Sequence, residues 1–263
     1  MAVILITGAS SGIGAALARE YDRRGHRVAL LARRVDRIQS LAHELRDARG
    51  IACDVCDDAS VERAFDEVED AFGRIDVVVA NAGVGINGAV ANLSIDDFRR
   101  QMETNVFGVL RTVKCAIEPL RETKGRLALV GSVSGYLSLP GTAPYAMSKF
   151  AVRALAEALA GELASDGISV THVAPGFVES EIRMVDNAGM YQKGKRDPIP
   201  SFLVMKGADA AREIADAIES REPEVVLTRV GQAAAWLTRR FPGGIRRVTK
   251  VAAGRIVDAV LGR

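Results

Sequence analysis

The segment that follows the first apolar run of this 263-residue chain constrains its fold more than any other. Residues 3–6 read as a short strand and lead directly into Thr7-Gly8-Ala9-Ser10-Ser11-Gly12-Ile13-Gly14, which a helical pattern over residues 15–24 follows. Glycines let the backbone turn sharply and let a pyrophosphate approach the helix N-terminus, where free N–H groups and the helix dipole stabilise negative charge. The order of strand, glycine-rich turn and helix therefore predicts a dinucleotide-binding site, against the alternative of an ordinary tight turn.

Short β-branched runs alternate with longer helical patterns along the rest of the chain. Further strands are expected at residues 27–31, 50–53, 75–80, 126–131, 168–173 and 224–227. Apolar residues keep a helical period over residues 34–49, 60–72, 95–123 and 145–165, and Ser94 with Asp97 predicts a capping box. The alternation predicts an α/β fold, a Rossmann-type doubly wound parallel sheet of about seven strands in a single domain.

The end of the second predicted strand bears on the choice of nucleotide. An acidic residue at this place would bond the 2′-hydroxyl of the adenosine ribose. The chain has Arg33 and Arg34 there instead, and its first acid is Asp36. Guanidinium groups offer a planar fork of donors to phosphate oxygens, so the pair favours NADP over NAD. Two solvated arginines at the start of a helix are the alternative interpretation.

A tyrosine and a lysine lie four residues apart at the start of a helical pattern. Tyr145 and Lys149 therefore share a helix face, and a cation beside a tyrosine stabilises its phenolate. Ser132 follows the fifth predicted strand and brings a hydroxyl to the carboxyl end of the sheet, where ligands bind. Tyr191 and Lys195 have the same spacing but lie in a polar segment, so Tyr191 is interpreted as a surface or lid residue.

Taken together, these motifs resemble the short-chain dehydrogenase/reductase family, in its NADP-preferring branch. The resemblance covers the order and spacing of motifs from Thr7 to about Ser180, where serine replaces the usual threonine. It implies catalytic roles for Asn105, Ser132, Tyr145 and Lys149. It implies cofactor contacts for Gly8, Ser10, Ser11, Gly12, Ile13, Gly14, Arg33, Arg34, Asp54, Val55, Asn81, Gly83, Tyr145, Lys149, Pro175, Gly176, Val178 and Ser180.

The implied activity is that of an NADP(H)-dependent carbonyl reductase or alcohol dehydrogenase. Ser132 would bond the substrate carbonyl, Tyr145 would act as general acid and base, Lys149 would lower the pKa of Tyr145, and Asn105 would anchor a water path. A non-catalytic NADP-binding regulatory protein on the same fold is the alternative. A serine hydrolase is disfavoured because Val133 stands at the centre of the G-x-S-x-G-like segment.

Residues 181–207 are expected to cover the substrate. Their methionines, Phe202 and Leu203 favour a hydrophobic carbonyl or alcohol substrate, although the same residues could fill core space. We also expect a homo-oligomer, a dimer or a tetramer.

The net charge of +2 conceals a basic C-terminal segment. From residue 225 onward eight basic residues face one acid, a balance of +7, so the other 224 residues sum to −5. Residues 231–241 and 245–261 read as two amphipathic helices, which predicts a catalytic domain over 1–228 and a basic helical extension over 229–263. Such an extension packs on its own domain, lies on a membrane surface or meets a partner, and the pattern leaves these open. Few aromatic residues argue against nucleic acid.

The three cysteines, Cys53, Cys56 and Cys115, suit a reducing compartment. Only Cys53 and Cys56 have metal-ligand spacing and no second pair exists, so we expect no metal site. The start of the chain lacks the pattern of a signal peptide, and a cytoplasmic protein, with peripheral membrane contact as an option, is expected.

Overall fold

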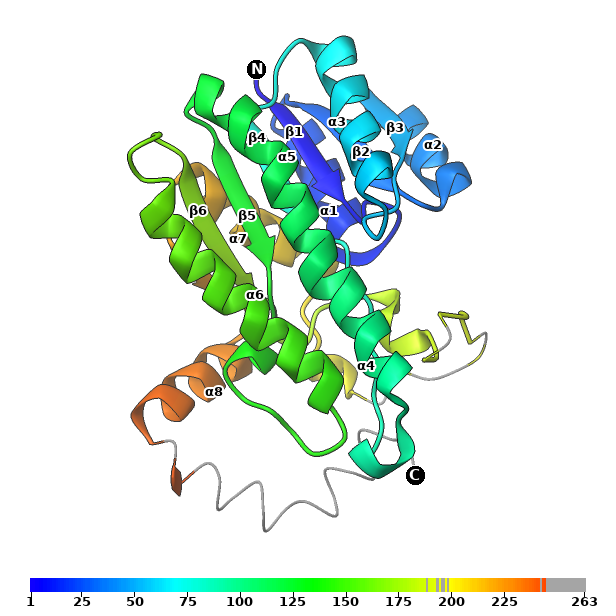
Figure 1. Cartoon of the computed structure of the whole chain (residues 1–263), viewed down its shortest axis with the longest axis vertical. Helices are drawn as coiled ribbons and strands as arrows, with labels where there is room; N and C mark the ends of the chain where they lie inside the picture. Colours follow the sequence, from blue (N-terminus) through cyan, green and yellow to red (C-terminus); the bar gives the residue numbers. More distant parts are fainter. Residues whose placement is uncertain (188, 193, 195–196, 198, 242, 245–263) are drawn as a thin grey trace.

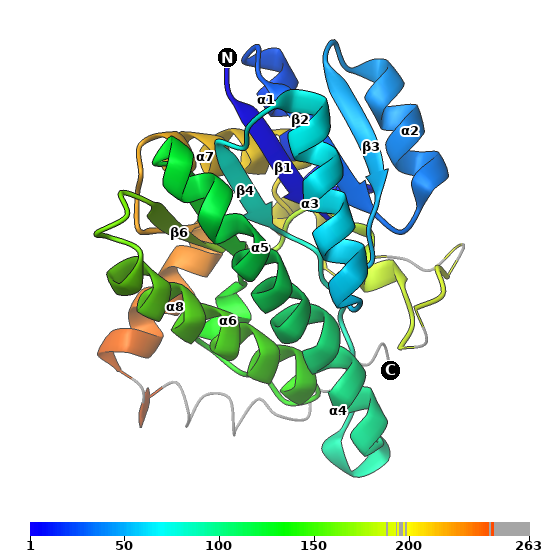
Figure 2. The ribbon, with the colours of Figure 1, turned by 45° about the horizontal axis from the view of Figure 1, so that its top comes forward.

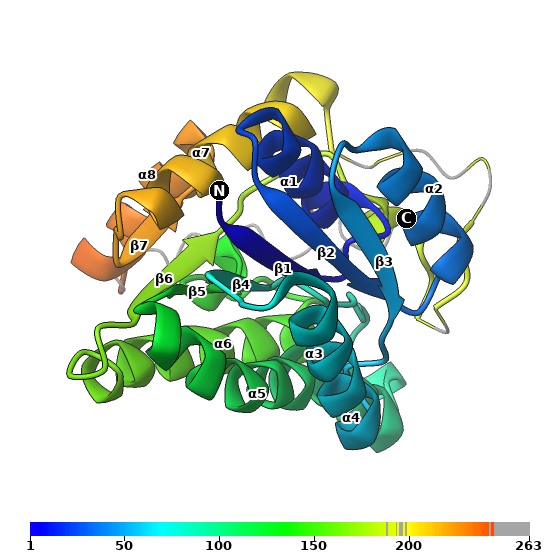
Figure 3. The ribbon, with the colours of Figure 1, turned by 90° about the horizontal axis from the view of Figure 1, so that it is seen from above.

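Seven strands form one parallel sheet in the computed structural model, which describes residues 1–187, 189–192, 194, 197, 199–241 and 243–244. The strands are β1 (Val3–Thr7), β2 (Arg27–Ala32), β3 (Ala48–Ala52), β4 (Val77–Ala80), β5 (Arg126–Val130), β6 (Ser169–Ala174) and β7 (Glu224–Val226). Their order is β3-β2-β1-β4-β5-β6-β7 (Figure 1, with β7 labelled in Figure 3), so the direction in which successive strands are added to the sheet reverses between β1 and β4. The predicted doubly wound sheet is confirmed.

Helices cover both faces of the sheet, as the view from above shows (Figure 3). The elements are α1 (Gly12–Arg23), α2 (Val35–Glu44), α3 (Asp58–Phe72), α4 (Ile95–Met102), α5 (Gly108–Thr123), α6 (Ala143–Glu162), α7 (Gly207–Glu219) and α8 (Arg229–Arg240). A π-helical turn η2 (Glu103–Phe107) joins α4 to α5, and the 3₁₀ turns are η1 (Val90–Asn92), η3 (Val133–Gly135), η4 (Glu181–Met184) and η5 (Ser201–Leu203). One apolar core lies under α3, α5 and α6, and a second under α1, α2 and α7.

The central strands are buried on both faces, which explains their near-continuous apolar sequences. Every residue of β1 and β4 is buried. β7 lies at the sheet edge beside β6, and its residues are only partly buried. The buried inner strands therefore fix the positions of the loops that follow their carboxyl ends.

Some element boundaries differ from those predicted. The helix expected over residues 34–49 ends at Glu44, because Leu45 is extended and β3 starts at Ala48 to pair with Val28. The helix expected over residues 95–123 contains the π-helical turn η2 between α4 and α5, and Figure 2 shows α4 and α5 following one another end to end. The capping box at Ser94 and Asp97 is confirmed, whereas α7 had no counterpart among the predicted helices.

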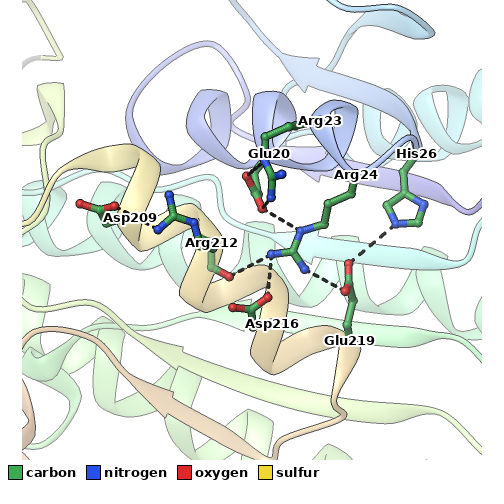
Figure 4. A network of polar contacts seen from close by, with 8 residues as sticks. All are labelled: Glu20, Arg23, Arg24, His26, Asp209, Arg212, Asp216 and Glu219. Carbon is green, nitrogen blue, oxygen red and sulfur yellow. Dashed lines mark hydrogen bonds and ion pairs between the residues drawn. The ribbon is translucent and has the colours of Figure 1, made fainter.

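Helix α7 packs beside α1, and an ion-pair network joins them (Figure 4). The Arg24 guanidinium lies 2.8 Å from Glu20, 2.7 Å from Asp216 and 2.8 Å from Glu219. The side chain of Arg24 is only 13% exposed, so these carboxylates compensate the removal of its charge from water. The network ties the first helix of the chain to the seventh.

Helix α8 packs against the end of the sheet rather than projecting from it. Its Ala235 is buried with Tyr136 and Ala174, and Arg239 lies 2.7 Å from Glu224 and stacks over the Tyr136 ring. Residues 245–261, expected as a second helix, lie outside the described residues. Among the described helices, none is long and apolar enough to cross a membrane.

Candidate active site

The glycine-rich turn after β1 adopts a conformation that side chains would obstruct. Gly8 and Gly12 have positive φ angles of 67° and 55°, a region that L-residues rarely adopt. A Cβ atom on Gly8 would lie 2.7 Å from Ala82 Cα, and one on Gly14 would lie 2.6 Å from the carbonyl oxygen of Gly8. The turn at the N-terminus of α1 therefore packs too closely against its surroundings to accept a side chain at Gly8 or Gly14.

Hydrogen bonds join the carboxyl ends of β1 and β4, the two strands between which the strand order reverses. The Thr7 hydroxyl accepts hydrogen bonds from the backbone N–H groups of Asn81 at 3.0 Å and Ala82 at 3.1 Å. The Asn81 side-chain amide donates to the Thr7 carbonyl at 2.9 Å. These bonds fix the crevice in which ligands of open α/β sheets bind.

A cleft of about 550 Å³ lies along the carboxyl ends of the strands. It collects almost all the residues predicted for catalysis and cofactor contact, namely Gly8, Ser10, Ser11, Gly12, Ile13, Arg33, Arg34, Asp54, Val55, Asn81, Gly83, Ser132, Tyr145, Lys149, Pro175, Gly176, Val178 and Ser180. Gly14 and Asn105 do not line it. Gly14 packs under the turn, and Asn105 is fully buried.

Ser132 and Tyr145 bring two hydroxyl groups to this cleft. Ser132 begins η3, where its Oγ accepts a hydrogen bond from the Ser134 N–H at 3.0 Å. Burial raises the pKa of Tyr145, while the Ser132 hydroxyl and the positive charge of Arg183 act in the opposite direction. The phenol is therefore protonated at neutral pH and has a hydroxyl partner beside it.

Lys149 is a buried cation next to Tyr145. Its Nζ donates to the Val130 carbonyl at 2.9 Å and lies 5.7 Å from the centroid of the Tyr145 ring. The residue is 4% exposed, and this burial lowers its pKa to about 8. One turn of α6 thus holds the tyrosine and the lysine on a common face, as their spacing predicts.

Asn105 acts on the cleft through the loop after β4. It lies in the π-helical turn η2, where its side chain accepts from the Val84 N–H at 2.8 Å and donates to the Val84 carbonyl at 3.0 Å. The same amide donates to the Ser148 hydroxyl at 3.1 Å, and Ser148 donates to the Tyr145 carbonyl. Asn105 therefore joins the loop carrying Gly83 to the helix carrying Tyr145.

Arg34 stands beside the glycine-rich turn. Its Nη2 donates to the hydroxyls of Ser10 at 2.8 Å and Ser11 at 2.7 Å, and its Nη1 lies 3.0 Å from Glu181. Arg37, one turn further along α2, also donates to Glu181. Arg37 and Glu181 were not predicted from the sequence, because 144 positions separate them and no local pattern signals their contact.

Arg183 is another cleft residue that the sequence did not reveal. Its guanidinium donates to both oxygens of Asp197 and to the Val178 carbonyl. The pairing holds a positive charge at the cleft near Tyr145. The Arg183–Asp197 pair lies in a segment of irregular structure, where hydrophobic periodicity does not indicate which residues meet.

The cysteines lack metal-binding geometry. All three are free thiols, and the described residues contain no group of His, Cys, Asp and Glu that could hold a metal ion. Burial raises the pKa of Cys53 to about 12, so its thiol stays protonated. Cys53 and Cys56 instead line the cleft beside Asp54 and Val55.

The fold and this cleft define a class of protein, the nucleotide-dependent oxidoreductases built on a doubly wound sheet. Residues 2–191 match the family model described as short chain dehydrogenase. The chain belongs to the short-chain dehydrogenase family.

Relatives and solved structures agree with this assignment. A bovine protein named dehydrogenase/reductase SDR family member 7B is 30% identical over 240 residues, which cover 86% of this chain and 73% of the relative. An alcohol dehydrogenase of the archaeon Thermococcus sibiricus, complexed with 5-hydroxy-NADP, superposes with a TM-score of 0.77 at 32% identity, covering 86% and 96% of the two chains. A 3-ketoacyl-(acyl-carrier-protein) reductase of Brucella melitensis, complexed with NADH, gives 0.76 at 27% identity, covering 85% and 94%. This protein is thus an oxidoreductase related to nicotinamide nucleotide enzymes.

Proposed function

We propose that this protein is an NADP(H)-dependent oxidoreductase that interconverts a carbonyl compound and its alcohol. The observation that carries the proposal is the meeting of Ser132, Tyr145 and Lys149 in the same cleft as the glycine-rich turn. A regulatory protein without activity would have no need of this set, so the non-catalytic alternative is disfavoured.

The residues along the cleft fit a dinucleotide from end to end. The turn from Gly8 to Gly14 would hold the pyrophosphate, Asp54 and Val55 the adenine, and Asn81 and Gly83 the nucleotide between them. Pro175, Gly176, Val178 and Ser180 would contact the nicotinamide end. When bound, the nicotinamide supplies or accepts the hydride.

The protein's own groups then handle the proton and the carbonyl oxygen. Ser132 would donate a hydrogen bond to that oxygen, and Tyr145 would give it a proton or remove one. A protonated Lys149 would stabilise the phenolate that Tyr145 becomes on giving up its proton. Asn105 would hold the loop after β4 and helix α6 in place through its hydrogen bonds to Val84 and Ser148.

The preference for NADP over NAD is supported by the end of β2. Arg33 and Arg34 both line the cleft, and no acidic residue stands at that strand end. Fixed hydrogen bonds to Ser10 and Ser11 orient the Arg34 guanidinium beside the turn. Such an arrangement suits a phosphate group better than a ribose hydroxyl.

Apolar side chains in the cleft and at the surface support two further parts of the proposal, the class of substrate and the assembly of the protein. Val84, Ile86 and Ile182 line the cleft, which suits a hydrophobic substrate. Phe107 and Phe150, 48% and 42% exposed, lie on the contacting elements η2 and α6, which suits a second copy of the chain in a homo-oligomer.

The Tyr145→Phe variant tests the catalytic assignment. Loss of the phenolic proton is expected to lower NADPH-dependent reduction of hydrophobic ketones by about 100-fold or more, because general acid catalysis contributes factors of this order. NADPH binding, followed by fluorescence, should change little.

A matched control is Tyr21→Phe, which removes a buried hydroxyl that has no hydrogen-bond partner among the described residues and does not line the cleft. It should keep its activity. Turnover of Tyr145→Phe near the level of the unaltered protein would rule out the mechanism.

A further inference from the structure

The Glu181 carboxylate bridges two guanidinium groups at the start of α2. Glu181 Oε2 lies 3.0 Å from Arg34 Nη1 and 2.8 Å from Arg37 Nη1, and its Oε1 lies 2.9 Å from the same Arg37 nitrogen. Arg34 also donates to Ser10 and Ser11 of the glycine-rich turn. Both Arg34 and Glu181 line the cleft.

This carboxylate is ionised and open to exchange. Burial alone would raise the pKa of Glu181, but the hydrogen bonds and charges of Arg34 and Arg37 hold it below its usual value. The three side chains are 42%, 41% and 33% exposed for Arg34, Arg37 and Glu181. Ion pairs as exposed as these contribute little free energy, so another anion can displace the carboxylate.

A phosphate monoester is the stronger partner for the same donors. It carries a charge of about −1.5 to −2 and three acceptor oxygens, whereas a carboxylate carries one charge on two oxygens. An adenosine ribose with a free 2′-hydroxyl has no charge to offer. A 2′-phosphate can therefore displace the Glu181 carboxylate as the acceptor of the hydrogen bonds from the two arginines. An uncharged 2′-hydroxyl competes with the carboxylate much more weakly.

We propose that Glu181 is an internal competitor of the nucleotide 2′-phosphate: its carboxylate holds the donors of Arg34 and Arg37 and has to leave them when NADP(H) binds. Glu181 then limits the affinity for NADP(H) and moderates its preference over NAD(H). The inference rests on the proposed cofactor preference and adds a specificity-determining residue to it.

Calorimetric titration of the full chain with two adenine nucleotides tests the inference without a catalytic assay. Adenosine 2′,5′-bisphosphate carries the 2′-phosphate, and adenosine 5′-diphosphate lacks it. The Glu181→Gln variant is expected to bind the bisphosphate roughly three- to tenfold more tightly than the unaltered protein, with its affinity for the diphosphate nearly unchanged.

Two controls separate competition from a general charge effect. Glu44→Gln also removes one negative charge, at the end of α2. Glu44 pairs with Arg19 at 2.7 Å and not with Arg34 or Arg37, so this variant should bind the bisphosphate and the diphosphate as the unaltered protein does. In a chain that also carries Arg34→Ala and Arg37→Ala, Glu181→Gln should give no gain, because the contested donors are gone.

The outcomes distinguish the inference from the proposed cofactor. If the unaltered protein favours the bisphosphate and Glu181→Gln gives no gain, the competition is refuted while the NADP preference stands. If the unaltered protein shows no preference but Glu181→Gln creates one, the competition is supported and the native preference is not. An equal gain in Glu44→Gln, or no preference in any variant, overturns the inference.

Discussion

Lys149 shows, at the scale of a single residue, how the burial of a proposed catalytic side chain affects stability. Burial lowers its pKa from 10.5 to about 8, so the folded protein binds this proton less tightly than the unfolded chain does. As pH falls from about 10.5 to about 8, the unfolded state takes up a proton that the folded state does not, and folding becomes less favourable. Below about 8 both states are charged and no further loss occurs.

As pH falls from about 10.5 to about 8, the Lys149→Met variant should therefore become more stable relative to the unaltered protein. Each pKa unit corresponds to about 1.4 kcal/mol, so the difference in the free energy of unfolding should grow by about 3 kcal/mol between pH 10.5 and pH 8. Urea unfolding at several pH values measures it. A difference for Lys149→Met that does not change with pH would contradict the burial argument.

At this scale, the sequence predicted the residues of the cleft better than their partners. Glycines, the Tyr145–Lys149 spacing and Ser132 each belong to a local pattern, and the structure brings them to one cleft. Glu181 and Arg183 escaped because their partnerships depend on the path of an irregular segment. Nothing in the neighbouring residues encodes such a path.

At the scale of an element, the π-helical turn η2 is the least predictable feature. Hydrophobic periodicity runs from residue 95 to 123 and predicts one helix, because one widened turn hardly disturbs the pattern. The turn is where Asn105 reaches the Val84 backbone. Such bulges occur frequently at functional sites. Helix α7 was missed although its buried residues, among them Ala210, Ile214 and Ile218, recur at helical spacing.

The Asn105→Ala variant should loosen this element. Gln101 also donates to the Val84 carbonyl, so the loss falls chiefly on the part-buried Val84 N–H, which is left without its acceptor. An unsatisfied buried donor costs about 1–3 kcal/mol, and because the Val84 N–H is only part-buried the free energy of unfolding should fall by about 1 kcal/mol. Amide hydrogen exchange at Val84 should also accelerate.

The exposed Asn92→Ala is the matched control and should change neither quantity. Unaltered exchange at Val84 in Asn105→Ala would show that the side chain does not hold the loop.

At the scale of the whole molecule, α8 is the helix that the structure describes in the basic segment. α8 is integrated into the domain, with Ala235 buried and Arg239 paired with Glu224. Thr228 begins this helix at a φ of 66°, an unusual conformation for a β-branched residue, and its hydroxyl accepts from the Gly231 N–H at 3.0 Å. Packing and capping together hold it in that conformation.

A chain ending at Leu227 should consequently be less stable than one ending at Gly244. Removing α8 uncovers Tyr136, and burial of one large side chain contributes about 1.5–3 kcal/mol, so a loss of this size is expected. Chemical unfolding of the two truncated chains measures it. Equal midpoints would mean that α8 adds nothing to the domain.

The pairing of α1 with α7 bears on the order in which the protein is made. Arg24 and Asp216 are 192 positions apart, yet they meet in the network of Figure 4. During synthesis, the apolar face of α1 leaves the ribosome long before its partner has been translated. Nascent chains with exposed apolar surface are prone to aggregation. We therefore expect a chaperone to bind this domain until α7 has emerged from the ribosome.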